Sequence, residues 1–122
     1  MLNFFKNKKE PQNLEEILSQ FEELKENFEK VLKEVDDLKK ENKLNVQKIG
    51  LVRFNPFKEI GGNQSFCLAL LDGNDDGIVI TSLYAREGNR LYGKNVKNGT
   101  SEHLLMEEEK EAIEQAKKIK ID

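Results

Sequence analysis

Four side chains in the middle of the chain are of the types that bind a small anion or a peptide: Arg53, Arg86, Tyr92 and Lys94. Arginine presents a planar fork of N–H donors that fits a carboxylate or phosphate, and lysine adds a mobile positive charge. Because strands joined by hairpins lie side by side, we expect these residues to meet, together with Ser82, on one face of a sheet. The alternative is that the arginines pair with nearby carboxylates on a polar face of the sheet.

Three other features invite a chemical role, and each has a plainer explanation. Cys67 is the one cysteine and lies inside an apolar run, so we expect a buried, unreactive thiol with no disulfide and no zinc site. His103, the one histidine, has ordinary loop residues as neighbours. Residues 72–77 are rich in Asp and Gly, but an EF-hand calcium loop needs about twelve residues between two helices, so a turn is expected. We therefore predict no catalytic residue, no metal, no cofactor and no enzymatic activity.

The charge of the chain is divided unevenly along its length. Of the 122 residues, 35% are charged, and 21 of the first 48 are charged against 12 of the next 57. This division predicts a polar arm in front of a globular segment. Both signs are mixed throughout and the pI is about 5.4, which argues against nucleic acid as a partner, because that partner needs clustered Lys and Arg.

Residues 1–12 are predicted to be a disordered leader. Their apolar residues Leu2, Phe4 and Phe5 form too short a run for a signal peptide, which needs about 7–15, or for a spanning helix, which needs about 20. Lysines follow closely, so the leader is compatible with contact at a membrane surface but not with crossing it. We expect a cytoplasmic protein, with a position peripheral to the inner face of the membrane as the alternative.

Residues 13–45 are predicted to form a coiled-coil helix that begins after Asn13, a good N-cap residue. Its apolar residues follow one another at spacings of 3, 4, 3, 4, 3, 4 and 3, which is an unbroken heptad pattern. The a positions are Leu14, Phe21, Phe28 and Val35, and the d positions are Ile17, Leu24, Val31 and Leu38. A strict period of 3.5 favours a mutual seam between chains, so we expect a homo-oligomer. The alternative is that the helix folds back on the globular segment of its own chain.

Residues 46–122 are predicted to form a small α+β domain. Runs of apolar and alternating residues predict strands at 48–54, 65–71, 78–84 and 90–96, with links short enough for antiparallel hairpins. The run at 65–71 is nearly continuous, which is typical of a central strand buried on both faces. Residues 107–118 predict a helix, and a stripe of apolar residues suits it to cover the sheet: Leu105, Ala112, Ile113, Ala116 and Ile119.

The same residues resemble a known family, the bacterial domain-of-unknown-function family 4446. The resemblance covers residues 46–117 and the coiled coil before them, and it is carried by Val52, Arg53, Phe54, Pro56, Phe57, Gly61, Gly62, Ser65, Phe66, Ala69, Leu70, Leu71, Asp72, Gly77, Thr81, Ser82, Arg86, Tyr92, Lys94 and the Glu-rich helix from Glu107. Many relatives have a membrane-spanning helix before the coil, and this chain departs from that pattern. It also carries Met106 where relatives tend to have a helix-capping Ser. The resemblance implies the fold and no activity.

Together these patterns predict a non-enzymatic bacterial protein with an oligomerising coiled coil, residues 13–45, and a small α+β head, residues 46–122. In this hypothesis the coil assembles copies of the chain, and the head contacts a protein partner. The alternative is a module that recognises a small anion or peptide through the four side chains considered first.

Overall fold

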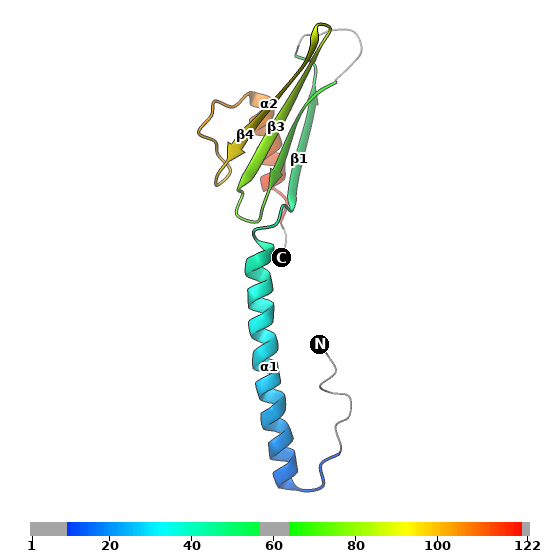
Figure 1. The fold of residues 1–122 in the computed structure, drawn as a ribbon, viewed down its shortest axis with the longest axis vertical. Coiled ribbons are helices and arrows are strands. Elements are labelled where there is room, and N and C mark those ends of the chain that lie inside the picture. The colour runs from blue at the N-terminus through cyan, green and yellow to red at the C-terminus, as the bar shows by residue number, and fades with distance from the viewer. Residues whose placement is uncertain (1–9, 57–63, 121–122) are drawn as a thin grey trace. The chain divides into compact units, whose positions relative to one another are not determined.

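The computed structural model describes residues 10–56 and 64–120 (Figure 1). Its elements are α1 (Leu14–Asn42), β1 (Lys48–Phe54), β2 (Ser65–Leu71), β3 (Gly77–Ala85), β4 (Gly88–Val96) and α2 (Glu107–Lys117). The predicted α+β class, with a long helix, four antiparallel strands and a final helix, is confirmed. The chain divides into two compact units, Met1–Lys39 and Lys40–Asp122. Most of the predicted leader, including its apolar and basic residues, lies outside the described residues.

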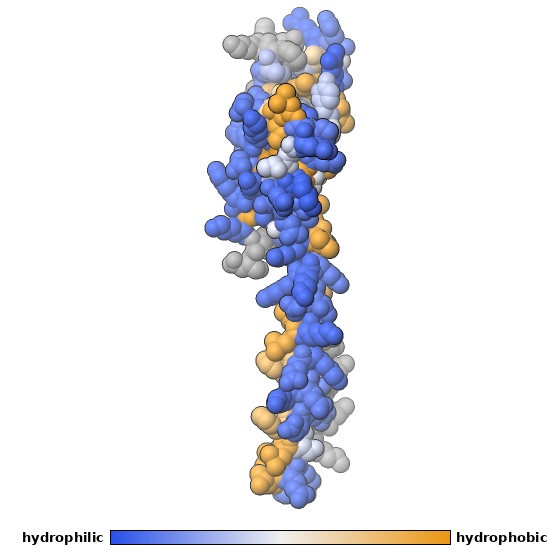
Figure 2. Space-filling view, turned by 90° about the vertical axis from the view of Figure 1, so that its left-hand side faces the viewer, coloured by the Kyte–Doolittle hydropathy of each residue, from blue (hydrophilic) through white to orange (hydrophobic). Residues whose placement is uncertain are grey.

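Helix α1 is 29 residues long, which corresponds to about 44 Å at ~1.5 Å per residue. The Oδ1 atom of Asn13 accepts a hydrogen bond from the backbone N–H of Glu16 at 2.8 Å, so the predicted N-cap is confirmed. Glu15 and Glu16 occupy the first turn, where the helix dipole favours acidic side chains. No residue of α1 is buried, and Figure 2 shows its apolar side chains gathered along one side of the helix.

The four strands form one antiparallel sheet in the order β1-β2-β3-β4, so each strand pairs with its neighbours in sequence. Gly50 of β1 lies opposite Ala69 of β2, Ala69 lies opposite Val79 of β3, and Val79 lies opposite Lys94 of β4. Because side chains alternate along a strand, these residues and every second residue from them share one face. Successive residues between them lie on the other face.

Helix α2 covers the first of these faces, and Figure 1 shows it behind the strands. A Cβ atom on Gly50 would overlap the carbonyl oxygen of Ala112, so the helix approaches β1 as closely as a missing side chain permits. The buried core lies between the two layers and contains Val52, Cys67, Ala69, Leu71, Val79, Val96, Ala112, Ile113 and Ala116. The predicted stripe of α2 therefore covers the sheet, although Ile119 is 38% exposed.

Strand β2 is central, but the prediction that it is buried on both faces is wrong. Its burial alternates between buried and half-buried residues, because α2 covers one face and no described element of the second unit covers the other. An apolar run in the sequence indicates that both faces of the strand are apolar. It does not indicate which element, if any, packs against each face.

Neither helix in residues 10–56 and 64–120 combines the length and the apolar character that crossing a membrane requires.

Candidate functional site

The most unusual polar residue of the head is Glu109, a carboxylate on α2 that is fully buried against the sheet. Its Oε1 atom accepts hydrogen bonds from the Nζ atom of Lys94 at 2.8 Å and from the backbone N–H of Met106 at 2.7 Å. Its Oε2 atom accepts one from the hydroxyl of Thr81 at 2.7 Å. Both carboxylate oxygens are therefore occupied by donors from the sheet and from the start of the helix.

These donors decide the charge state of Glu109. Burial by itself raises the pKa of the carboxyl, because a low-dielectric surrounding disfavours the charged form. The hydrogen bonds from Lys94, Met106 and Thr81 outweigh burial and hold the pKa below its ordinary value. The group is thus an ionised partner of Lys94 near neutral pH and not a proton donor poised for catalysis.

Cys67 continues this buried cluster on β2. Its Sγ atom lies 3.2 Å from the hydroxyl oxygen of Thr81, and its side chain is fully buried in the core. Burial raises the pKa of the thiol, which keeps it protonated and poorly nucleophilic. The predicted buried cysteine is confirmed.

Sequence reasoning did not find Glu109, although one signal pointed to it. The residue occupies the same stripe of α2 as Ala112, Ile113 and Ala116, where an apolar side chain is expected. A charged residue inside an apolar stripe requires a partner of opposite charge, which Lys94 supplies from β4.

The register of the sheet separates the residues predicted to meet on one face. Arg53 lies opposite Phe66, and Phe66 lies opposite Ser82, so Arg53 and Ser82 share the face away from α2. Tyr92 lies opposite Thr81, which places Tyr92, together with Lys94, on the face that α2 covers. The expectation that these side chains share one face is therefore wrong.

Arg86 stands apart from this sheet-face geometry because it lies in the turn between β3 and β4. The two arms of this hairpin line an open hollow of about 640 Å³, and Arg86, Glu87 and Arg90 are among its lining residues. A carboxylate that lines the same hollow as two guanidinium groups offsets part of their attraction for an anion.

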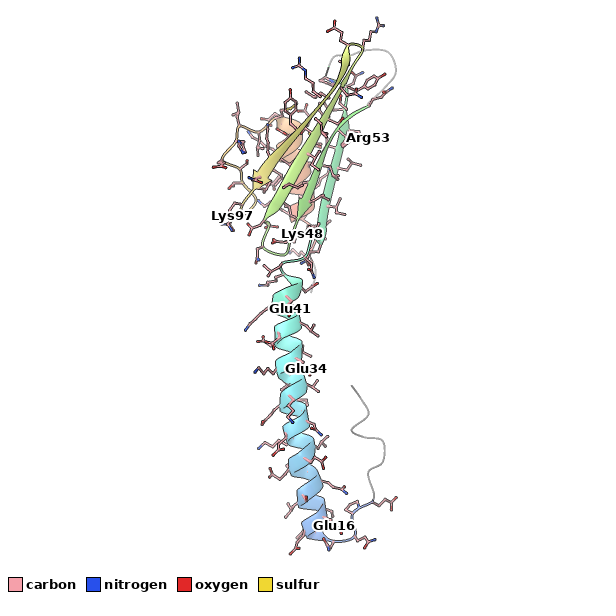
Figure 3. All side chains as sticks on the ribbon, viewed as in Figure 1. Glu16, Glu34, Glu41, Lys48, Arg53 and Lys97 are labelled. Carbon is pink, nitrogen blue, oxygen red and sulfur yellow. The ribbon has the colours of Figure 1, made fainter. Side chains whose placement is uncertain are left out.

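A turn between β2 and β3 is observed, as predicted for residues 72–77; it spans 72–76, and Gly77 begins β3. The Oδ1 atom of Asp72 accepts hydrogen bonds from the backbone N–H groups of Asn74 and Asp76, at 2.8 and 3.0 Å. The carboxylate of Asp75 pairs with the Nζ atom of Lys48 at 2.9 Å. Lys48 lies at the first end of β1, and Arg53 lies near the other end (Figure 3). The carboxylates thus serve the turn itself and its neighbouring strand.

His103 lies on the surface before α2, half exposed, with its Nε2 atom 3.8 Å from the carboxylate of Glu102. In residues 10–56 and 64–120, no three His, Cys, Asp or Glu side chains are grouped so as to hold a metal ion.

Comparison with known families matches residues 1–117 to a family model described as "Protein of unknown function (DUF4446)". The chain belongs to the DUF4446 family. This result confirms the resemblance found on residues 46–117 and on the helix before them. No curated protein and no solved structure matched the chain. Because the DUF4446 description names no activity, any function must be argued from the surfaces of the two units.

Proposed function

We propose that this chain is a non-enzymatic oligomerisation module, in which α1 joins copies of the chain and the α+β head is presented to a protein partner. We call the eight a and d residues of α1 the α1 seam. The observation that supports this proposal most directly is that seven of these eight residues are exposed and the eighth, Val31, is only half-buried. Leu14 is 68% exposed, Phe21 60% and Phe28 59%. Such a contiguous apolar stripe on a charged helix is typical of an interaction surface.

The spacing of the α1 seam favours a second copy of the same helix as its partner. Seven successive spacings of 3 and 4 keep the apolar residues on a line that follows a supercoiled partner. In a parallel pair, Glu34 at a g position and Lys39 at the next e position attract one another across the seam.

The energies involved are sufficient for association. Fully burying one large apolar side chain stabilises by roughly 1.5–3 kcal/mol. If each side chain of two seams contributed about 1 kcal/mol, the sum would be on the order of 16 kcal/mol. This sum slightly exceeds the upper end of the ~4–15 kcal/mol cost of association.

The experiment is a measurement of mass in solution by light scattering, on the full chain at tens of micromolar. We expect an oligomer for the wild type and a monomer for Phe28→Asp, because a carboxylate in the centre of the seam would lose its water without a partner. Ser19→Asp is the matched control, since it adds the same charge at an exposed f position and should leave the mass unchanged. A monomeric wild type, or an unchanged mass for Phe28→Asp, would contradict the proposal.

The proposal that this protein is not an enzyme is supported by the buried polar groups, which are paired or protonated and so are poorly suited to act on a substrate. Lys94 and Glu109 pair with one another, and the thiol of Cys67 is protonated in the core. The alternative function, anion or peptide binding by a basic cluster, is disfavoured because Arg53 lies on the other face of the sheet from Tyr92 and Lys94. We further infer a cytoplasmic location. The acidic pI and the mixed charges of the chain argue against a nucleic-acid partner.

A further inference from the structure

The sheet face away from α2 carries a block of apolar side chains on three adjacent strands. In one row across the sheet, Ile49 lies opposite Leu70, which lies opposite Ile78. In the next row, Leu51 lies opposite Leu68, which lies opposite Ile80. We call these residues the open face: Ile49, Leu51, Leu68, Leu70, Ile78 and Ile80. None of them is charged, in a chain of which 35% is charged.

The open face has the composition of an interface. Ile49 is 55% exposed, Leu51 48% and Ile78 39%, and the other members are half-buried. The next row continues it with polar and apolar residues, among them Arg53 and Ser82. An apolar centre with a polar border is the arrangement found where proteins associate.

The side chains of the open face favour another sheet as its partner. On the covered face, small residues such as Gly50 and Ala69 let α2 approach the backbone closely. The open face has no small member on these three strands, and its branched side chains are suited to interdigitate with those of a second sheet at ~10 Å.

Charge indicates that this second sheet is the same face of another copy. The block is neutral, and the one charged residue on this face in β1 and β2 is Arg53, in the row beyond Leu51. A two-fold axis through the middle of the block would place the two Arg53 side chains at opposite ends of the contact, where both remain solvated. Neither a strongly acidic partner nor nucleic acid would find complementary charge in the block itself.

The open face is too small to hold two separate heads together by itself. Three strands spaced about 4.8 Å apart, with two rows of side chains about 7 Å apart, cover only some hundreds of Å². A stable interface buries about 800 Å² on each partner. Joining two chains through the α1 seam raises the effective concentration of one head for the other to about the millimolar range, at which a weak contact forms.

We propose that the open face packs against the open face of a second copy, so that two sheets form a sandwich within the assembly joined by α1. This proposal rests on the proposed function, because it needs α1 to bring the heads together. It assigns a role to the half-buried apolar residues on the side of β2 that no described element of the second unit covers.

The test measures how fast a maleimide reacts with a thiol placed on the open face of the full chain, Leu51→Cys, with Ile78→Cys as a second position. Cys67 is fully buried, so its thiol is not expected to react with the maleimide. We expect these thiols to react about tenfold more slowly in the assembled chain than after Phe28→Asp is added, because α1 then no longer joins the heads. Glu111→Cys, on the exposed side of α2, is the matched control and should react equally fast in both backgrounds.

Mass measured on the same samples separates the two proposals. An assembled wild type whose Leu51→Cys and Ile78→Cys thiols react as fast as in the Phe28→Asp background would overturn sheet pairing and leave the role of α1 intact. A monomeric wild type would overturn the proposed function and sheet pairing with it. Thiols that stay protected in the Phe28→Asp monomer would also overturn sheet pairing, because the cover would then come from the same chain.

Discussion

Lys94 at the edge strand β4 donates a hydrogen bond to the Oε1 atom of Glu109 on α2, at 2.8 Å. The Nζ atom of Lys94 also donates to the carbonyl oxygen of Leu104 at 2.8 Å, in the segment that leads into the helix. The side chain of Glu109 is 1% exposed and that of Lys94 is 22% exposed. One lysine thus fastens the end of the sheet to the start of α2, across the boundary of the two layers.

Removing this lysine is expected to destabilise the head strongly. Lys94→Met keeps most of the aliphatic stem but leaves the carboxylate of Glu109 buried without its ion-pair partner. We expect the free energy of unfolding to fall by about 2–4 kcal/mol, which allows for the partial exposure of Lys94. The measurement is urea unfolding at neutral pH.

The control for this variant is Lys97→Met, which removes a lysine that is 79% exposed and lies 3.3 Å from Asp76. An exposed ion pair contributes only about 0–1 kcal/mol, so a small change is expected. Equal losses for Lys94→Met and Lys97→Met would show that burial of Glu109 has no energetic consequence.

The pH dependence of stability should carry the signature of Glu109. Hydrogen bonds hold its folded-state pKa below that of the unfolded chain, which is about 4.3. The carboxylate therefore contributes stability above the unfolded pKa, and this contribution is lost as the pH falls through the folded pKa. We expect the difference in unfolding free energy between wild type and Glu109→Gln to be largest near neutral pH and to shrink toward pH ~3.

Urea unfolding of both proteins across this pH range gives the difference directly. Glu107→Gln is the matched control, because its side chain is 88% exposed and its loss should have little effect at any pH. A difference for Glu109→Gln that stays constant down to the acid limit would mean that the folded and unfolded chains bind the proton equally.

The strands and helices were predictable because each has a local signal. The strand predicted at 78–84 is observed as β3 (Gly77–Ala85), and the helix predicted at 107–118 is observed as α2 (Glu107–Lys117). Turn residues between apolar runs mark hairpins, and the cap at Asn13 marks where α1 begins.

The candidate site was less predictable, because the face of the sheet on which a side chain lies depends on the register of the strands. A shift by one residue moves a side chain to the other face, so the spacing between Arg53 and Tyr92 alone does not decide whether they meet. The observed register places them on opposite faces. The pairing of Lys94 with Glu109 is likewise a contact between β4 and α2 that no local pattern encodes.

The close approach of α2 to β1 makes a last prediction, in which two glycines of the same sheet behave oppositely. At Gly50 a Cβ atom would overlap the carbonyl oxygen of Ala112, and the backbone nitrogen of Ala116 lies 3.0 Å from it. Because backbone atoms of a packed helix yield little, we expect Gly50→Ala to lower the free energy of unfolding by about 1–3 kcal/mol or more.

At Gly93, on β4, a Cβ atom would meet nothing within 4 Å. Gly93→Ala should therefore be neutral or stabilise by up to about 1 kcal/mol, since alanine reduces the freedom of the unfolded chain.

Urea unfolding of the two alanine variants beside the wild type measures both effects under one condition. The comparison isolates the helix contact, because both substitutions add one methyl group to a strand at the edge of the same sheet. A loss at Gly50→Ala no larger than at Gly93→Ala would mean that α2 moves away from β1 at little cost. The core formed by Ala112 and Ala116 against the sheet would then be looser than the contact at Gly50 implies.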